Sequence, residues 1–162
     1  MRHINVLVLL LPLFLLACNS NTESSSNAAG TAPVAAQEVA TYPVLPMDEG
    51  RILATKCDYI DYLFYQLPMS MSFNDPASIQ SALSYIDVKP APTNPGCKSI
   101  GRVAFQSQGE ILMEAELYFA PNGCAQFVFL KDNKPTYGNL MHPNGIKFLG
   151  DLINRAKGQP TQ

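Results

Sequence analysis

The chain has 162 residues, of which 15% are charged, and its formal net charge is −2. A charge this close to zero argues against nucleic acid and against any strongly charged partner. Beyond the N-terminal stretch, about 115 residues remain, which is enough for one domain with a modest core.

The first eighteen residues have the organisation of an export signal. Arg2 supplies a basic start, and an apolar run of about 14 residues follows from Ile4 to Ala17. This run is shorter than the ~20 residues of a membrane-spanning helix. Pro12 lies inside the run and also argues against a stable spanning helix.

The run ends in Leu15-Leu16-Ala17-Cys18, which resembles the lipobox of bacterial lipoproteins. The resemblance covers only these residues. It implies cleavage before Cys18, a diacylglyceryl group on its sulfur and acylation of the new amino group, for example by palmitate. Several acyl chains anchor a protein stably. The alternative is an ordinary secretory signal that happens to contain a cysteine.

Asn19 stands where many lipoproteins of the inner membrane carry Asp. The same resemblance therefore favours the outer membrane, with the protein facing the periplasm or the cell surface. Residues 18–44 are rich in Ser, Asn, Ala and Thr and predict a flexible tether with a mean reach of roughly 25–30 Å. Residues 45–158 are expected to form one domain, and residues 159–162 a disordered tail.

Two helices are expected at the start of the domain. Asp48 can cap a helix over residues 49–67, which Pro68 ends. Its apolar positions recur at intervals of three and four and are Leu53, Cys57, Ile60, Phe64 and Leu67. Asp75 and Pro76 begin a second helix over residues 76–86. Three prolines predict a loop over residues 89–96.

From Cys97 onward the apolar residues alternate, which predicts four strands over residues 99–106, 110–120, 124–131 and 135–141. A last helix follows His142 and ends at Gly158. The expected fold class is α+β, with two N-terminal helices, a four-stranded antiparallel meander, a C-terminal helix, and the helices on one face of the sheet. This layout resembles the repeat unit of β-lactamase inhibitory protein and small outer-membrane assembly lipoproteins, without shared motif residues.

The turns predict which face of this sheet is buried. Three-residue loops at Ser107-Gln108-Gly109 and Pro121-Asn122-Gly123 place Phe105 opposite Ile111, Leu117 opposite Phe127, and Arg102 opposite Glu114. Every apolar pair in this register is odd-numbered, so the odd-numbered face is expected to be the core.

The even-numbered face is the expected partner-binding surface. Leu112, Tyr118, Val128 and Leu130 would form an apolar strip with a polar rim, which is typical of an interaction site. An equally weighted alternative is that the stretch Tyr42 to Pro46 folds across this face and covers it.

The remaining chemistry-bearing residues are few. A disulfide between Cys57 and Cys97 is favoured, and Cys97–Cys124 is the alternative if the loop before the first strand folds over. His142 is the only histidine after the export signal; it is expected in a loop or cap, and a role as general base would need partners. No catalytic residue, metal site or cofactor is expected.

The sequence thus predicts a membrane-anchored envelope lipoprotein, attached through Cys18, whose domain is not an enzyme and binds another envelope protein as an accessory subunit or inhibitor. The alternatives are an envelope hydrolase that uses His142 and a small-ligand carrier with a cavity between helices and sheet.

Overall fold

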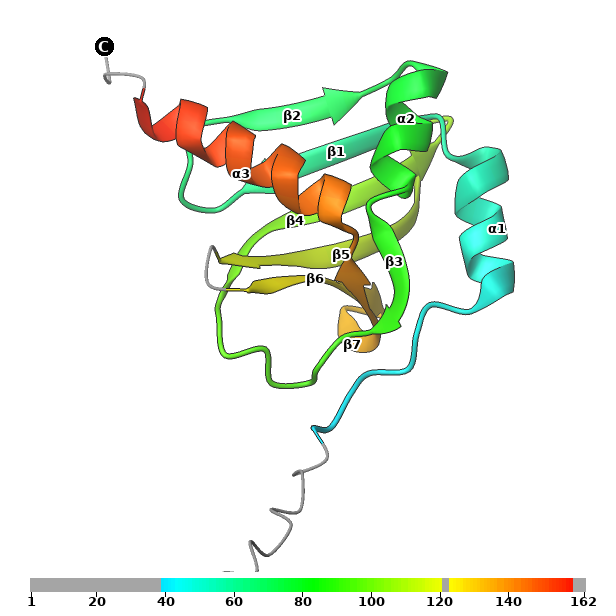
Figure 1. Cartoon of the computed structure of the whole chain (residues 1–162). Coiled ribbons are helices and arrows are strands. Elements are labelled where there is room, and N and C mark those ends of the chain that lie inside the picture. Colours follow the sequence, from blue (N-terminus) through cyan, green and yellow to red (C-terminus); the bar gives the residue numbers. More distant parts are fainter. Residues whose placement is uncertain (1–38, 121–122, 159–162) are drawn as a thin grey trace, which may run out of the picture. The chain divides into compact units, whose positions relative to one another are not determined.

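The computed structural model describes residues 39–120 and 123–158, which contain one seven-stranded antiparallel sheet in the order β2-β1-β4-β5-β6-β7-β3 (Figure 1). The strands are β1 (Tyr59–Phe64), β2 (Ser70–Phe73), β3 (Ile86–Pro90), β4 (Ser99–Ser107), β5 (Glu110–Ala120), β6 (Cys124–Lys131) and β7 (Lys134–Met141). The helices are α1 (Met47–Lys56), α2 (Pro76–Leu83) and α3 (Pro143–Gly158). Cys18, the expected export signal and the expected tail lie outside the described residues.

The expected helix over residues 49–67 is wrong, because α1 ends at Lys56 and β1 begins at Tyr59. Residues 59–64 are rich in aromatic and branched side chains, which favour strands. Ile60, Tyr62 and Phe64 are buried at alternate positions, which is a strand period. Ile60 and Phe64 are also four apart, so the same residues satisfied a helical pattern.

Two further strands lie where none was expected: β2 lies between the two expected helices, and β3 covers the end of the second expected helix and the start of the expected loop. β2 lies on one side of β1, and β3 pairs with the far side of β7, so the expected four-stranded sheet is corrected to seven strands. The second helix begins at Pro76 as expected, since the Asp75 side chain accepts a hydrogen bond of 2.9 Å from the Ser78 N–H. It ends at Leu83, which frees Ile86 for β3. With a strand in place of the long first helix, the layout that resembled β-lactamase inhibitory protein is absent.

The meander β4 to β7 and the final helix are confirmed, and so is the buried odd-numbered face. Val103, Phe105, Leu117, Phe127 and Phe129 are each at most 1% exposed. In Figure 1, α2 and α3 lie across one side of the sheet. All three helices contribute to the same apolar cluster, through Leu53, Ile79 and Leu149.

The β4–β5 and β6–β7 hairpins each combine a two-residue turn with a β-bulge, which was not predicted from the sequence. The β4–β5 turn has only two residues, Gln108 and Gly109, with φ of 53° and 83°. Positive φ at both positions is typical of two-residue hairpin turns. Such a turn places even-numbered residues of β4 opposite odd-numbered residues of β5, as in the pair Gln106 and Ile111. A one-residue bulge in β5 then places odd-numbered residues opposite each other, as in the pair Phe105 and Met113. The β6–β7 hairpin repeats the arrangement with a turn at Asp132 and Asn133.

The end of the expected tether belongs to the domain. The Tyr42 N–H donates to the Ala91 carbonyl at 2.8 Å, and the Gly138 N–H donates to the Pro43 carbonyl at 2.8 Å. A Cβ atom on Gly138 would lie 2.7 Å from a ring carbon of Tyr42, so the ring rests on the β7 backbone. Tyr42 thus covers the even-numbered side of β7 at Gly138, which agrees with part of the alternative in which this stretch folds across that face.

The favoured Cys57–Cys97 disulfide is wrong, because Cys97 is bonded to Cys124 and Cys57 is a free thiol. Cys97 precedes β4, so its position is not fixed by the spacing of two strands. The chain before β4 brings its Cα atom to 6.4 Å from that of Cys124, within the range that a disulfide spans. The Cys97–Cys124 pairing is the alternative that the sequence left open.

Two glycines provide a matched test of the packing between β1 and β4. A Cβ atom on Gly101 would collide with the Leu63 carbonyl oxygen, which is backbone, whereas one on Gly50 in α1 would meet nothing within 4 Å. We expect Gly101→Ala to lower the free energy of unfolding by about 1–3 kcal/mol. Gly50→Ala should instead raise it by about 0.5–1 kcal/mol, because alanine favours the helix.

Urea denaturation of the two variants measures whether the free energy of unfolding falls in Gly101→Ala and rises in Gly50→Ala. A Gly101→Ala protein as stable as the wild type would contradict the close approach of the two strands.

Candidate functional site

The face of the sheet away from the helices carries a mixed group of polar and apolar side chains on β1, β4 and β5. Cross-strand pairing aligns Leu63, Arg102 and Glu116 in one row, and Asp61, Ala104 and Glu114 in the next. Tyr65 follows β1, and its N–H donates to the Ile100 carbonyl at 2.9 Å. We call this group the outer patch; its members are Asp61, Leu63, Tyr65, Arg102, Glu114 and Glu116.

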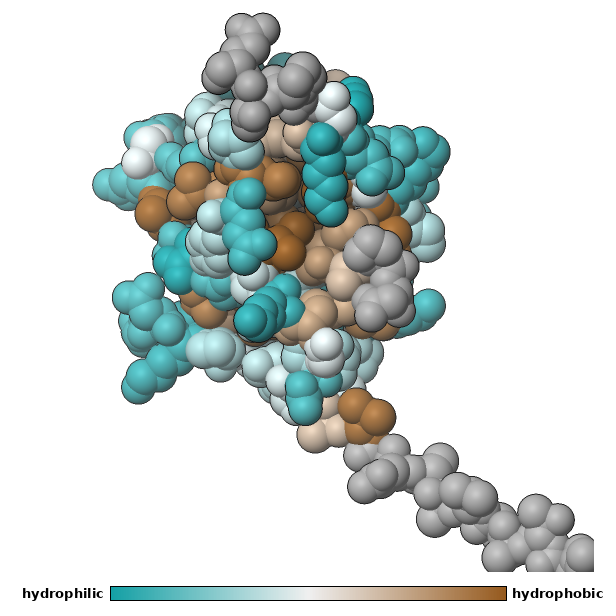
Figure 2. Space-filling model, turned by 90° about the vertical axis from the view of Figure 1, so that its left-hand side faces the viewer, coloured by the Kyte–Doolittle hydropathy of each residue, from teal (hydrophilic) through white to brown (hydrophobic). Residues whose placement is uncertain are grey.

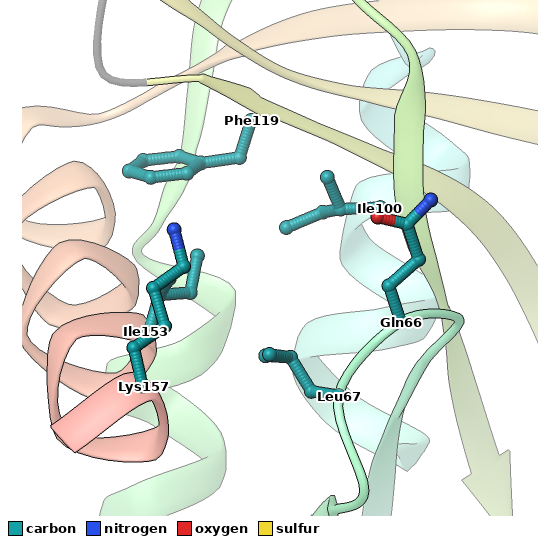
Figure 3. A pocket seen from close by; sticks show the side chains of 6 residues that line it. All are labelled: Gln66, Leu67, Ile100, Phe119, Ile153 and Lys157. Carbon is teal, nitrogen blue, oxygen red and sulfur yellow. The ribbon is translucent and has the colours of Figure 1, made fainter.

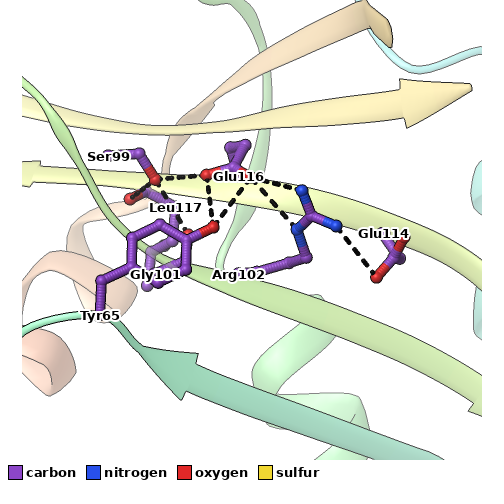
Figure 4. A network of polar contacts seen from close by, with 7 residues as sticks. All are labelled: Tyr65, Ser99, Gly101, Arg102, Glu114, Glu116 and Leu117. Atoms are coloured by element: carbon purple, nitrogen blue, oxygen red, sulfur yellow. Dashed lines mark hydrogen bonds and ion pairs between the residues drawn. The ribbon is translucent and has the colours of Figure 1, made fainter. Parts of the chain in front are cut away.

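Glu116 is the centre of the outer patch (Figure 4). Its Oε1 accepts hydrogen bonds from Arg102 Nη2 at 2.9 Å and from Arg102 Nε at 3.2 Å. Its Oε2 accepts one from the Ser99 hydroxyl at 2.6 Å. The Tyr65 hydroxyl lies 2.9 Å from both oxygens and donates to the carboxylate. Three strands or strand ends are thus joined through one carboxylate.

These donors decide the ionisation of Glu116. Partial burial disfavours the charged form, but hydrogen bonds from Ser99, Arg102 and Tyr65 outweigh it and hold the pKa of Glu116 below its usual value. Four donors nearly fill the acceptor capacity of a carboxylate. Such a group is a poor general base near neutral pH. Glu116 is therefore suited to positioning its neighbours.

Glu116 also affects the ionisation of Arg102 and Tyr65. The hydrogen bond to Glu116 raises the pKa of Arg102, with Glu114 adding to the effect. Desolvation and the hydrogen bond to Glu116 raise the pKa of Tyr65, which keeps its hydroxyl protonated as a donor. Arg102 Nη1 lies 3.6 Å from Glu114, too far for a strong hydrogen bond. Glu114 thus keeps acceptor capacity for a group outside the chain.

The apolar part of the outer patch is exposed. Leu63 is 54% exposed and Tyr65 is 51% exposed. Asp61 accepts a hydrogen bond of 2.7 Å from the Ser72 hydroxyl, which has no charge to offset the carboxylate. Three carboxylates against one guanidinium leave an excess of two formal negative charges. The arrangement can receive an apolar side chain with a basic group beside it.

The four residues expected to bind a partner are not exposed as a strip. Leu112 is the extra residue of the β5 bulge and packs against the core cluster. Val128 is 1% exposed, because it lies opposite Gly138, on which Tyr42 rests. Tyr118 and Leu130 are half-buried on the outer side of β5 and β6. Desolvation, with Tyr42 adding to it, raises the pKa of Tyr118.

His142 lies at the start of α3, where its Nδ1 accepts a hydrogen bond of 3.3 Å from the Asn144 N–H. Its carbonyl accepts from the N–H groups of Gly145 and Ile146. These are the bonds of a helix cap, as the sequence predicted. Cys57 is half-buried, and its thiol lies 3.4 Å from the Tyr59 carbonyl. Burial raises the pKa of this thiol and makes it a weak nucleophile.

Sequence reasoning missed Leu63 and Tyr65 because it placed both inside a helix. The signal was present, since Tyr59 to Tyr65 contains four aromatic residues and one isoleucine, which strands favour. It also placed Arg102 opposite Glu114, whereas the two-residue turn and the β5 bulge each move the register by one residue and together bring Glu116 there.

Comparison with known proteins adds no function to this geometry. No protein-family model matches the chain, and neither the curated proteins nor the solved structures contain a significant match. Among residues 39–120 and 123–158, no helix is long and apolar enough to cross a membrane. Within the same ranges, no three His, Cys, Asp or Glu side chains are grouped so as to hold a metal ion.

The lowered pKa of Glu116 predicts a pH-dependent contribution to stability. A carboxylate with a depressed pKa in the folded state stabilises the fold above its usual pKa of 4.5, and this contribution is lost as the pH falls through the folded value. Glu116→Gln should therefore cost about 1 kcal/mol at pH 7. The difference from the wild type should shrink as the pH falls below 4.5.

Chemical denaturation across this pH range measures the difference. Glu110→Gln, at the exposed start of β5, is the matched control and should cost less. A loss for Glu116→Gln that is the same at pH 7 and at pH 3 would contradict this account of the carboxylate.

Proposed function

We propose that this protein is an envelope lipoprotein whose domain docks onto another envelope protein through the outer patch, as an accessory subunit or inhibitor. The observation that carries the docking surface is the pair Leu63 and Tyr65, both about half exposed on a sheet face without helices, beside a fixed ion-pair network. An apolar centre with a polar rim is typical of interaction sites.

The outer patch favours a partner of definite chemistry. Its apolar part calls for an aliphatic or aromatic side chain, and its excess negative charge calls for Lys or Arg beside that side chain. Arg102 and Glu116 are already paired, so Asp61 and Glu114 are the carboxylates that a partner's cation can reach. Docking of this kind is expected to weaken as the salt concentration rises.

The Cys18 lipid anchor is the other half of the proposed function. Acyl chains would hold the domain at the outer membrane, where the tether allows it to turn toward a partner. The support for this is the lipobox Leu15-Leu16-Ala17-Cys18 together with the apolar run before it.

A paired substitution tests the docking surface. Leu63→Arg places a cation at the centre of the outer patch, whereas Val88→Arg places the same charge on the edge strand β3, where Val88 is 85% exposed. We expect the wild-type protein and Val88→Arg to co-purify with the same envelope protein after crosslinking and solubilisation. Leu63→Arg should lose at least 90% of that protein, about a tenfold loss of affinity or 1.4 kcal/mol.

Both residues are exposed, so both variants should unfold at the wild-type urea concentration, which serves as the control. If Leu63→Arg retains the partner in wild-type amount, the outer patch is not the docking surface.

A second experiment tests the anchor on its own. The mature protein should begin at Cys18 and carry a diacylglyceryl thioether and an N-acyl group, so mass spectrometry of its N-terminal peptide should show both additions. Cys18→Ser should move the protein from the outer-membrane fraction to other fractions. A mature chain with an unmodified Cys18 thiol, or one that begins at another residue, would overturn the lipoprotein assignment.

A further inference from the structure

A pocket of about 150 Å³ opens at one end of the domain, between α3 and the sheet. It is lined by Gln66 and Leu67 from the β1–β2 turn, Ile100 from β4, Phe119 from β5, and Ile153 and Lys157 from α3. Figure 3 shows the side chains of Leu67 and Ile100 on one side, those of Ile153 and Lys157 on the α3 side, and the ring of Phe119 above Ile153 and Lys157 in this view. None of these residues belongs to the outer patch.

The walls of the pocket are a continuation of the core. Leu67, Ile100 and Ile153 are partly buried and pack against the buried cluster, and Phe119 is 9% exposed. Figure 2 views the molecule from this end and shows apolar side chains gathered in a hollow with hydrophilic residues around it. The helix layer and the sheet layer therefore separate here and leave apolar surface open to water.

The volume sets the size of a ligand. An apolar cavity of about 150 Å³ in another protein holds one benzene molecule, so this pocket has room for about six carbon atoms. A longer chain would extend beyond Leu67 and Ile153 into solvent. A phospholipid does not suit this pocket, because its acyl chains are much longer than six carbons. If the end of such a chain reached the pocket floor, the headgroup would lie far outside the pocket.

The charge of the pocket lining indicates which polar group the ligand carries. Lys157 is the one charged residue of the lining, and the last turn of α3 also carries Arg155. A lysine at this position also suits the carbonyl groups at a helix C-terminus. Its four-carbon stem can lie along the apolar wall while its ammonium group reaches the opening. The lining thus combines an apolar interior with one cation.

We infer that this pocket binds a short monocarboxylate, with a hydrocarbon chain of about six carbons against Phe119 and Ile153 and its carboxylate beside Lys157. A free carboxylic acid is the ligand that places a negative charge one short chain away from the pocket floor. This binding is independent of partner docking at the outer patch.

Hexanoate is the probe for this site. It is titrated into the purified protein in the form that cells produce, and the methyl NMR signals of Ile100 and Ile153 are followed. We expect saturable shifts of both signals, while the methyl signal of Ile146, which is 40% exposed elsewhere on α3, stays in place. Hexanol should bind about fivefold more weakly than hexanoate, and hexylamine more weakly still.

Lys157→Met keeps the apolar stem and removes the charge. It should weaken hexanoate binding about fivefold and leave hexanol binding unchanged. Lys147→Met, on the same helix but paired with Asp151 and outside the pocket, is the matched control and should bind hexanoate like the wild type.

Three results would overturn the assignment: no saturable shift at Ile100 and Ile153, equal affinity for hexanoate and hexylamine, or wild-type hexanoate affinity in Lys157→Met.

Discussion

The burial of odd-numbered side chains along β4 to β7 is the constraint on which the rest of this structure depends. Two-residue turns at both outer hairpins of the meander would bring odd-numbered residues opposite even-numbered ones, and a one-residue bulge corrects each of them. The cost of exposing residues such as Phe105 and Phe129 explains why the correction is needed. The same bulge leaves Leu112 as an extra residue in β5 and, together with the two-residue turn, brings Glu116 opposite Arg102. The polar network of the outer patch is thus a consequence of core packing.

The outer side of the sheet has a covered part and an exposed part. Over β6 and β7, the chain before α1 and the stretch around Pro92 cover it, and Gln126 Nε2 donates to the Pro92 carbonyl at 3.2 Å. Over β1, β4 and β5, no segment among the described residues covers it, and Leu63 remains exposed beside the Glu116 network. An exposed patch and a covered surface therefore lie side by side on one sheet.

The sequence predicts the meander well because alternation, turn residues and burial all agree there. It predicts Asp75 as a cap and His142 as the start of the last helix for the same local reasons. It fails for β1, where Ile60 and Phe64 satisfy both a helical and a strand period, so that only the pairing with β2 and β4 decides between them. The register of Arg102 and the Cys97–Cys124 disulfide depend on a bulge and a loop path, which no local pattern specifies. Two residues of the expected strip do not form it either, because Leu112 is the extra residue of the bulge and Val128 is covered.

We propose that the outer patch meets a partner while the protein is attached to the envelope. The most direct test places a photo-crosslinking amino acid at position 63, and separately at position 88, in the chain expressed in its own cells. Docking through the outer patch should give an adduct with one envelope protein from position 63, which high salt reduces in isolated membranes, and no such adduct from position 88. The same adducts from both positions, or none from position 63, would contradict it.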